Sequence, residues 1–315
     1  MILFSAKVSK KHHAGLMENY PGQSFIFCKN MNEAKGHLHK AEILVTYGED
    51  LNEELLEMAP RLKWIMVLSA GMDQMPFKEI EKKSILVTNA RGIHKIPMAE
   101  YAISMLLQVY RQAKVLIQKE KEHIWERSVP MQEMNGKTLL VAGTGAIGQE
   151  VARLAKAFQM NTLGISRSGK SVEHFDETYK TSELIGLLPR VDMVVSVLPS
   201  TEETKGLFTY DHFQRLPNHA VFLNMGRGDV TRSDDLLRAI REQEIAHAVL
   251  DVFEEEPLPA DHVFWDKENI TVTPHLSGIS RLYQTRALDI FQRNLQVYLD
   301  GKTELVNKID VARGY

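Results

Sequence analysis

The chain has 315 residues, of which 44% are hydrophobic and 25% charged, and its formal net charge is -3. This length predicts about two domains, each large enough to bury its own core. The 38 Lys and Arg residues are interspersed with 41 Asp and Glu residues, a balance that argues against nucleic acid or a membrane surface as a partner.

The single cysteine, Cys28, lies in an apolar run and cannot form an internal disulfide, so we expect a buried structural thiol and a reducing compartment. No apolar run reaches the ~18 residues of a membrane span. The short apolar stretch at residues 2–4 precedes the basic pair Lys10 and Lys11 and does not resemble a signal peptide. The sequence therefore predicts a cytoplasmic protein without a membrane-spanning segment.

The first ninety or so residues alternate between short apolar runs and helix-like patterns. A helical pattern occupies residues 53–58. Short strands are predicted at residues 25–28, 43–47, 63–68 and 85–88. This alternation describes one small α/β layer.

From Pro97 the pattern changes to one long helical stretch, residues 98–125. The apolar positions recur at the three- and four-residue spacing of an amphipathic helix. They are Ile103, Leu106, Leu107, Tyr110 and Val115. We therefore expect a single helix that begins close to Pro97.

The most informative segment is residues 138–148, an apolar run that leads into Gly143-x-Gly145-x-x-Gly148 and then into a helix-like pattern at 149–158. Gly143 permits the tight turn, Gly145 lets the backbone approach a pyrophosphate, and Gly148 lets helix and strand pack closely. The pyrophosphate is expected at the helix N-terminus. A glycine-rich turn alone is weak evidence, but its position between a strand and a helix predicts dinucleotide binding.

The second strand of this unit is not followed by the acidic residue that usually binds the ribose hydroxyls. Ser166, Arg167 and Ser168 occupy that place, and Lys170 follows. A carboxylate would repel a 2'-phosphate, whereas Arg167 can bind it bidentately and the serines can donate hydrogen bonds. The turn predicts NADP, as NADPH, in preference to NAD. The alternative is that Arg167 and Lys170 are solvated loop charges and that NAD is bound without the acid.

Further strand-helix alternation predicts a doubly wound parallel sheet in this second unit. Its strands are expected near residue 162 and at 191–197, 220–224, 248–252 and 270–272. A final amphipathic helix at 286–299 is expected to pack back on the first unit.

Three motifs follow predicted strands, at the strand ends where ligands collect in such sheets: NMGRG at 224–228, DVFEEEP at 251–257 and TPHLSG at 273–278. Arg227, between glycines, presents a fork that matches a carboxylate or an α-keto acid. His275 can protonate a carbonyl oxygen as hydride reaches the carbon, and a neighbouring carboxylate stabilises the charged ring. Each motif taken singly also fits an ordinary surface charge, a solvated acidic run or a turn residue.

Together, in this order after a dinucleotide loop, the motifs resemble the D-2-hydroxyacid dehydrogenase family, and the serine-arginine turn resembles its glyoxylate and hydroxypyruvate reductase members. The resemblance covers most of the chain, since it extends through residues 69–73, 88–93, 99–100 and 198–207. It implies an α/β fold of two Rossmann-like domains. A doubly wound, parallel-sheet nucleotide-binding domain would occupy 97–284, and a smaller, flavodoxin-like substrate domain would combine 1–96 with 285–315.

The resemblance also implies an activity, the NAD(P)-dependent reduction of a small 2-keto acid to the D-2-hydroxy acid. Arg227 would bind the substrate carboxylate and keto oxygen, His275 would be the general acid, and Glu256 would pair with His275 and stabilise its protonated form. Backbone amides of a loop in the other domain would hold the substrate carboxylate. That loop consists of Ser69, Ala70, Gly71 and Met72.

The cofactor residues implied by the resemblance extend beyond the serine-arginine turn. Asp251 would contact the nicotinamide amide, and Leu198 and Pro199 the adenosine side. The full set is Gly143, Thr144, Gly145, Ala146, Ile147, Gly148, Leu198, Pro199, Thr204, Met225, Gly226, Asp251 and Gly278.

The long helix after Pro97 resembles the family's dimerisation element, which implies a homodimer, although an ordinary interdomain helix would show the same amphipathic pattern. Two other functions fit the same fold: a nucleotide-sensing protein similar to the family's corepressor members, and 3-phosphoglycerate dehydrogenase. No metal site is predicted, because the histidine pairs at 12–13 and 37–39 lack further ligands at fixed spacing.

Overall fold

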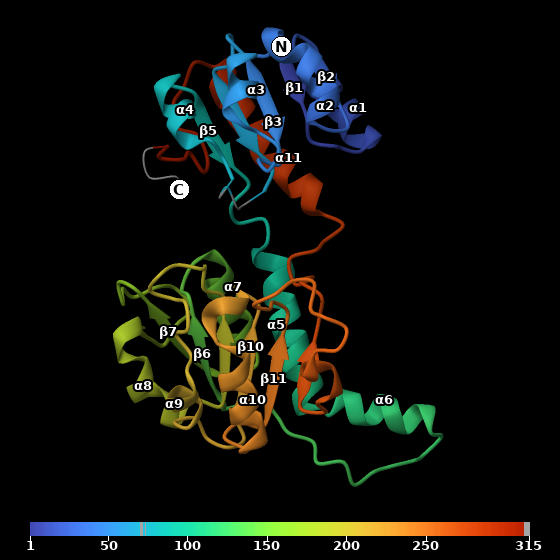
Figure 1. Ribbon diagram of the computed structural model, residues 1–315, viewed down its shortest axis with the longest axis vertical. Helices are drawn as coiled ribbons and strands as arrows, with labels where there is room; N and C mark the ends of the chain where they lie inside the picture. Colours follow the sequence, from blue (N-terminus) through green and yellow to red (C-terminus); the bar gives the residue numbers. More distant parts are fainter. Residues whose placement is uncertain (70–71, 73, 312–315) are drawn as a thin grey trace. The chain divides into compact units, whose positions relative to one another are not determined.

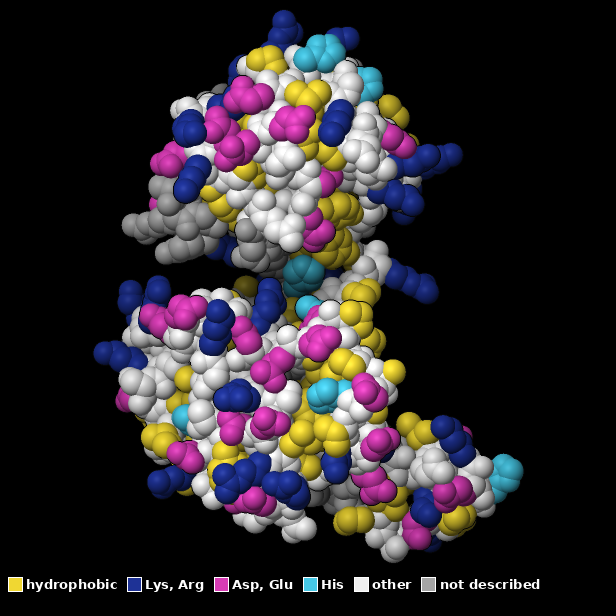
Figure 2. Space-filling view, in the orientation of Figure 1, with side chains coloured by type: hydrophobic (Ala, Val, Ile, Leu, Met, Phe, Trp, Pro, Cys, Tyr) yellow, Lys and Arg dark blue, Asp and Glu magenta, His cyan; other side chains and the backbone are white. Residues whose placement is uncertain are grey.

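The computed structural model describes residues 1–69, 72 and 74–311. The chain divides into two units, Met1–Ile93 with Ser280–Tyr315, and His94–Ile279 (Figure 1). Each contains one sheet in which every strand pairing is parallel, which confirms the predicted α/β class. Figure 2 shows positive and negative side chains interspersed on the visible face of each unit.

The smaller unit has a five-stranded sheet in the order β2-β1-β3-β4-β5, the flavodoxin-like order. The strands are β1 (Ile2–Phe4), β2 (Phe25–Phe27), β3 (Ile43–Thr46), β4 (Trp64–Val67) and β5 (Leu86–Asn89). Successive side chains enter opposite faces, so Leu44 joins one hydrophobic cluster while Ile43 and Val45 join the other. Burial on both faces explains why these strands are continuous apolar runs.

The last helix of the chain, α11 (Tyr283–Leu299), belongs to this smaller unit. It buries Phe291 against Trp64 and Phe4, with ring centroids 5.6 Å apart in both pairs. The remaining helices of the unit are α1 (Lys10–Asn19), α2 (Met31–Ala34), α3 (Glu53–Glu57) and α4 (Phe77–Lys82).

The prediction of one long helix after Pro97 is wrong, because the structure has two. Helix α5 (Lys95–Tyr110) begins two residues before Pro97. Pro97 therefore lies in the first turn of the helix, where its missing N–H costs no helical hydrogen bond. Gln112 then adopts a left-handed conformation with φ of 54°, which ends the first helix before α6 (Ala113–Lys121) begins. Helix α6 has no buried residue and runs away from the body of the larger unit (Figure 1).

The larger unit has a seven-stranded sheet in the order β12-β11-β10-β9-β6-β7-β8. The strand order reverses between β6 and β9, and ligands of doubly wound sheets bind at such a switch point. The strands are β6 (Thr138–Ala142), β7 (Asn161–Ser166), β8 (Glu177–Lys180), β9 (Met193–Ser196), β10 (Val221–Asn224), β11 (His247–Leu250) and β12 (Ile270–Val272). The sequence did not predict β8, because its residues are polar and partly exposed.

Helices cover both faces of the larger sheet. On one face α5 packs with α7 (Ala146–Ala157), and on the other lie α8 (Leu184–Leu187), α9 (Tyr210–Phe213) and α10 (Ser233–Arg241). Short 3-10 helices occur at Lys35–Lys40, Thr181–Glu183, Leu188–Arg190, Gly228–Val230 and Val263–Asp266. Within the described part of the chain, no helix has the length and apolar character needed to cross a membrane.

Candidate active site

The glycine-rich loop between β6 and α7 has the shape that dinucleotide binding requires. Gly143 has φ of +107°, a conformation that side chains rarely allow. A Cβ on Gly148 would lie 1.9 Å from the carbonyl oxygen of Gly143, so helix and loop meet without room for a side chain. A Cβ on Gly145 would meet no atom within 4 Å, which leaves space beside the loop for a phosphate.

The first residues of α7 follow this loop directly, and their backbone N–H groups have no partner within the helix. The Gln149 N–H donates to the Gly145 carbonyl, so Ala146 and Ile147 precede the first such bond and their N–H groups remain for an anion. The Gln149 side chain donates to the Thr144 carbonyl at 3.1 Å and closes the loop. These residues fit a pyrophosphate.

The serine-arginine turn follows β7 at the same end of the sheet. The Ser166 hydroxyl accepts the N–H of Gly169 at 3.2 Å, and that of Ser168 accepts the N–H of Lys170 at 3.3 Å. Because both hydroxyls act as acceptors here, each keeps its proton to donate to a ligand. Arg167 is exposed.

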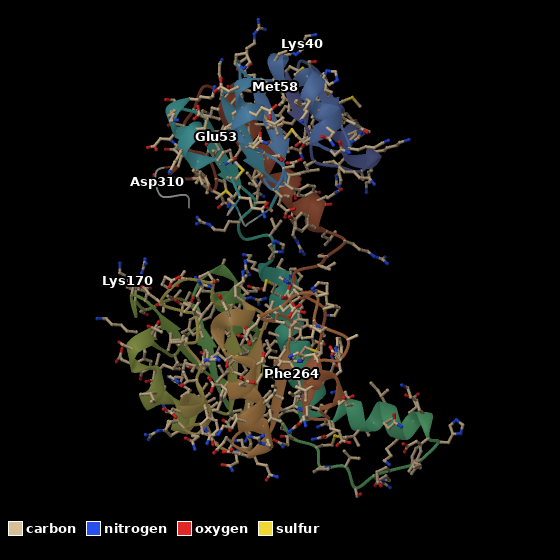
Figure 3. The ribbon with its side chains drawn as sticks, viewed as in Figure 1. Lys40, Glu53, Met58, Lys170, Phe264 and Asp310 are labelled. Carbon is tan, nitrogen blue, oxygen red and sulfur yellow. The ribbon has the colours of Figure 1, made fainter. Side chains whose placement is uncertain are left out.

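Lys180 is a further candidate that the sequence reasoning missed. It pairs in register with Ser166 across β7 and β8. A Cβ on Gly169 would lie 2.9 Å from Lys180 Cγ, so the lysine stem rests on the turn that holds Arg167. Figure 3 shows Lys170 at the periphery of the same unit. Three cations, Arg167, Lys170 and Lys180, thus belong to this turn and the strand beside it.

Arg227 lies in a turn that Asn224 shapes. The buried Asn224 amide donates to the Arg227 carbonyl at 2.9 Å and accepts the Gly226 N–H at 3.2 Å. Arg227 Nη1 donates to the Gly226 carbonyl at 2.8 Å, which leaves other guanidinium N–H groups for a ligand. A Cβ on Gly228 would lie 1.9 Å from the Phe253 carbonyl carbon, so this turn packs directly on the segment that carries Glu256.

Glu256 and His275 form the predicted pair. His275 Nδ1 lies 2.7 Å from Glu256 Oε2. The other oxygen, Oε1, accepts the Phe253 N–H at 3.0 Å, which fixes the carboxylate. The backbone of His275 is left-handed, with φ of 51°, a conformation uncommon outside glycine and often found at functional sites.

The neighbouring Glu254 has a different task from Glu256. Its carboxylate accepts the backbone N–H and the hydroxyl of Ser233, at 2.8 and 2.7 Å, and so caps the start of α10. The acidic run therefore contains one helix cap and one histidine partner.

Asp251 holds the loop that carries His275. This fully buried carboxylate accepts the Thr273 hydroxyl at 2.6 Å and the N–H groups of Leu276 and Ser277, each at 2.9 Å. Tyr101 of α5 bonds Thr273 Oγ1 at 2.7 Å, and since that hydroxyl gives its proton to Asp251, the phenol must be the donor. The predicted contact of Asp251 with a nicotinamide amide stays a prediction.

The remaining predicted residues shape neighbouring loops. Thr204 Oγ1 donates to the Pro199 carbonyl at 2.6 Å and closes the loop after β9. A Cβ on Gly226 would lie 2.6 Å from the Leu198 carbonyl oxygen, so those two loops touch. Met225 is buried, and Gly278 accepts a hydrogen bond from His94 Nδ1 at 3.3 Å.

The smaller unit carries the predicted substrate loop. Ser69 donates to the Tyr47 carbonyl at 3.0 Å, and Met72 is buried. Ala70 and Gly71 lie outside the described residues.

The other predicted residues share one edge of the larger sheet. Because the sheet is parallel, the carboxyl ends of β6, β9, β10, β11 and β12 lie together, and the glycine loop, Arg227, Glu256 and His275 follow them. A dinucleotide loop with an arginine and a histidine-carboxylate pair at one edge defines a nucleotide-dependent oxidoreductase of the doubly wound α/β class.

The sequence comparison gives the family. The profile of "D-isomer specific 2-hydroxyacid dehydrogenase, NAD binding domain" matches residues 103–277. Glyoxylate/hydroxypyruvate reductase A of Serratia proteamaculans is 31% identical over an alignment of 271 residues that covers 83% of this chain and 84% of that protein. The chain belongs to the D-isomer specific 2-hydroxyacid dehydrogenase family, as the motifs predicted.

Solved structures agree. A D-isomer specific 2-hydroxyacid dehydrogenase family protein from Aeromonas salmonicida matches with a TM-score of 0.85 and 36% identity, over 98% of this chain and 99% of that one. An NADPH-dependent glyoxylate/hydroxypyruvate reductase from Sinorhizobium meliloti, in complex with NADP and sulfate, matches with a TM-score of 0.77 and 27% identity, over 100% and 99%. The chain is therefore an oxidoreductase with a nicotinamide-nucleotide-binding domain.

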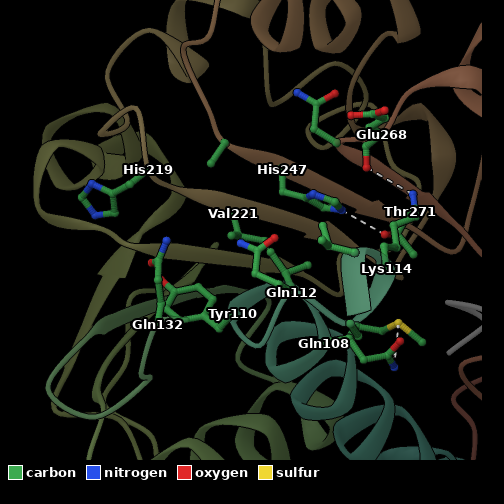
Figure 4. A pocket seen from close by; sticks show the side chains of 16 residues that line it. Gln108, Tyr110, Gln112, Lys114, Gln132, His219, Val221, His247, Glu268 and Thr271 are labelled. Atoms are coloured by element: carbon green, nitrogen blue, oxygen red, sulfur yellow. Dashed lines mark hydrogen bonds between the residues drawn. The ribbon is translucent and has the colours of Figure 1, made fainter. Parts of the chain in front are cut away.

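A separate cavity of about 270 Å³ lies at the opposite edge of the larger sheet (Figure 4). It is lined by the amino ends of the last three strands, through Val221, His247 and Thr271, and by the junction of α5 and α6. None of the described residues of the predicted site lines it. Since ligands of doubly wound sheets bind at the carboxyl ends of the strands, we do not assign the cofactor to this cavity.

His247 in this cavity makes stability depend on pH. Its Nε2 lies 2.9 Å from Thr271 Oγ1. Desolvation, and next the charge of Lys114, lower the pKa of His247 from 6.5 to about 4. Between these values the unfolded chain binds a proton that the folded chain does not, so the free energy of unfolding falls as the pH falls.

Between pH 6.5 and pH 4 we expect the free energy of unfolding of the wild type to fall by up to about 3 kcal/mol because of His247. The free energy of unfolding of His247→Gln should fall correspondingly less. Urea unfolding at several pH values measures the difference. His39→Gln, which replaces an exposed histidine of the smaller unit, serves as the control. Parallel pH curves for wild type and His247→Gln would contradict this assignment.

Proposed function

We propose that this protein reduces a small 2-keto acid to the D-2-hydroxy acid, with NADPH as the preferred cofactor. The observation that carries the proposal is the His275–Glu256 pair at the same sheet edge as Arg227 and the glycine loop. The larger unit would bind the dinucleotide, and the smaller unit would hold the substrate carboxylate through the loop that begins at Ser69. A nicotinamide bound at the glycine loop would supply the hydride.

The hydrogen bonds of Glu256 select the nitrogen that transfers the proton. Glu256 Oε1 is held by the Phe253 N–H, and an ionised Oε2 can only accept from His275 Nδ1. His275 Nε2 is then the nitrogen that donates a proton to the keto oxygen. After that transfer the proton stays on His275 Nδ1 and is donated to Glu256 in a hydrogen bond. This bond fixes the tautomer and the orientation of the ring.

Arg227 would bind and polarise the substrate. Nη1 is anchored on the Gly226 carbonyl, so the guanidinium is held in one place before the substrate arrives. Its free N–H groups match a carboxylate and an adjacent keto oxygen. As negative charge develops on the keto oxygen, this positive charge stabilises it.

The relatives guide the choice of substrates to test. Those from Serratia proteamaculans and Sinorhizobium meliloti are named as glyoxylate/hydroxypyruvate reductases, and the second was solved with NADP. We propose glyoxylate and hydroxypyruvate as the first candidates, with pyruvate, phenylpyruvate and 2-ketoisocaproate as larger or more apolar comparisons.

The preference for NADPH rests on the turn after β7. Arg167 is exposed there, Ser166 and Ser168 keep protons to donate, and Lys180 lies against the same turn. A 2'-phosphate carries negative charge that these groups can bind, whereas the 2'-hydroxyl of NADH gains little from them.

We also propose that the protein is a homodimer joined through α6 and the chain that follows it, residues 113–131, here called the α6 segment. Its exposed apolar side chains have no cover within the described chain, and Figure 2 shows several of them on the extended part of the larger unit. They are Val115, Leu116, Ile117, Ile124, Trp125 and Met131, with Trp125 91% exposed. Apolar groups gathered on a protruding segment are typical of a protein–protein interface.

The activity is tested by initial rates with NADPH and the five keto acids. His275→Ala is expected to lower kcat about 10²- to 10⁴-fold without changing cofactor affinity, because it removes the proton donor. Arg227→Ala should raise KM and lower kcat together, because Arg227 acts on substrate and transition state. His39→Ala, an exposed histidine of the smaller unit, is the control. Full activity of His275→Ala would refute the assignment, and tight NADPH binding without turnover in the wild type would favour a nucleotide sensor.

Cofactor choice is tested by the KM values for NADPH and NADH. Arg167→Ala should raise the KM for NADPH about 10- to 100-fold and leave that for NADH within about 2-fold, because a charge-assisted bond to the phosphate is lost. Lys180→Ala should act in the same direction by about 5-fold, since its single ammonium makes a weaker contact. Lys40→Ala, an exposed lysine of the smaller unit, should change neither value. An equal loss for both cofactors would rule out a phosphate site at this turn.

The dimer is tested by sedimentation equilibrium. The wild type should have twice the 35.9 kDa mass of the chain, and Trp125→Glu should shift it toward the monomer by burying a charge at the interface. Trp265→Glu is the control, because Trp265 is 49% exposed and lies in another part of the same unit. This variant should remain a dimer. A monomeric wild type, or equal effects of both substitutions, would contradict the proposed interface.

A further inference from the structure

The loop that carries His275 is held by polar contacts more than by apolar packing. Pro274, His275 and Leu276 are exposed, so burial of apolar surface contributes little there. The His275 N–H donates to the carbonyls of Asp251 and Thr273, at 2.9 and 3.0 Å. The place of the histidine therefore depends on how firmly those two residues are held.

The Thr273 hydroxyl stands between a phenol and a carboxylate. Its oxygen lies 2.7 Å from Tyr101 Oη and 2.6 Å from Asp251 Oδ1. An ionised carboxylate can only accept, so Thr273 gives its single proton to Asp251 and accepts the proton of the phenol. Burial raises the pKa of Tyr101, so the phenol keeps its proton near neutral pH. The three groups form a chain of hydrogen bonds that runs in one direction, and bonds in such a chain strengthen one another.

Helix α5 carries two buried phenols that differ in this bond. Tyr101 and Tyr110 belong to the same hydrophobic cluster and are 8% and 2% exposed. The hydroxyl of Tyr110 has no hydrogen-bond partner among the described residues. A phenylalanine at either position would keep the packing of the ring. Of the two hydroxyls, only that of Tyr101 makes a bond that reaches the candidate site.

From these contacts we propose that Tyr101 is a positioning residue for the proton donor, which acts through Thr273 to hold His275 in one orientation toward the keto oxygen. The inference rests on the proposed function, which gives His275 its role. Without the phenol hydroxyl, Thr273 still reaches Asp251 but loses the donor on its other side, and the loop gains freedom. Proton transfer is sensitive to that freedom, because it requires Nε2 within hydrogen-bond distance of the keto oxygen.

Tyr101→Phe tests the inference because it removes one hydroxyl and keeps the ring. With the keto acid that the wild type reduces fastest, we expect kcat to fall about 3- to 10-fold, as for one lost hydrogen bond. The KM values for the keto acid and for NADPH should stay within about 2-fold, because Arg227 and the glycine loop are unchanged.

Tyr110→Phe is the matched control, since it removes from the same helix a phenol hydroxyl without a partner in the described part of the chain. All three constants should equal those of the wild type. An unchanged kcat in Tyr101→Phe, or an equal loss in both variants, would overturn the proposal.

Thr273→Val tests the route by which Tyr101 acts. This substitution removes the hydroxyl that joins Tyr101 to Asp251, so adding Tyr101→Phe to it should change kcat by less than about 2-fold. If Tyr101→Phe lowers kcat by the same factor with and without the Thr273 hydroxyl, Tyr101 acts by another route and the proposal is wrong.

Amide hydrogen exchange separates this inference from the proposed function, because it requires no turnover. It is measured on peptides that contain the N–H groups of Leu276 and Ser277, which donate to Asp251. Faster exchange in Tyr101→Phe than in Tyr110→Phe supports the hold of Tyr101 on the loop, and equal exchange overturns it. A wild type that reduces none of the five keto acids would refute the proposed function, and with it the link between Tyr101 and kcat.

Discussion

The buried carboxylate of Asp251 is the constraint on which the rest of the candidate site depends. Burying a charge is unfavourable unless donors replace its water, and here two backbone N–H groups and one hydroxyl do so. All three donors come from the loop after β12, while Asp251 follows β11. The aspartate therefore ties two neighbouring strand ends together, and His275, which lies between Thr273 and Leu276, has little freedom to move.

This restraint explains how His275 tolerates a left-handed backbone. Such a conformation costs on the order of 1 kcal/mol or more and persists when its surroundings determine it. The N–H of His275 donates to the Asp251 carbonyl at 2.9 Å, so the same residue that holds the loop by its side chain also holds the histidine by its backbone. Tyr101 extends the network to α5 through Thr273. The geometry of the histidine-glutamate pair is thus set before any ligand binds.

The sequence predicted most of the fold because buried parallel strands are continuous apolar runs, as at Ile43–Thr46 and Val221–Asn224. It failed where the local pattern and the structure disagree. Glu177–Lys180 forms a strand with polar side chains, because it pairs at the sheet edge rather than in the core. The break at Gln112 is a left-handed residue inside a stretch whose apolar spacing continues, and nothing in the spacing marks it.

Part of the candidate site could also be predicted from the sequence, and part could not. Arg227, Glu256 and His275 lie in short motifs that follow strands, so sequence alone could propose them. Lys180 becomes a candidate only through its register with Ser166, which requires β8. Tyr101 bonds Thr273, 172 positions away in the chain, and no local pattern links them.

The division of the chain separates two parts of the proposed chemistry. The proton donor, its carboxylate partner, the arginine and the glycine loop all lie within His94–Ile279, so their mutual geometry is a property of one unit. Ser69, which begins the predicted substrate loop, belongs to the other unit, where its hydroxyl donates to the Tyr47 carbonyl. Changes to the histidine-glutamate pair or the glycine loop should therefore appear chiefly in kcat or in cofactor affinity, whereas changes to Arg227, which is proposed to bind the substrate, should also appear in KM. Changes to the substrate loop should appear in KM, because that loop is proposed to bind the substrate carboxylate and takes no part in proton transfer.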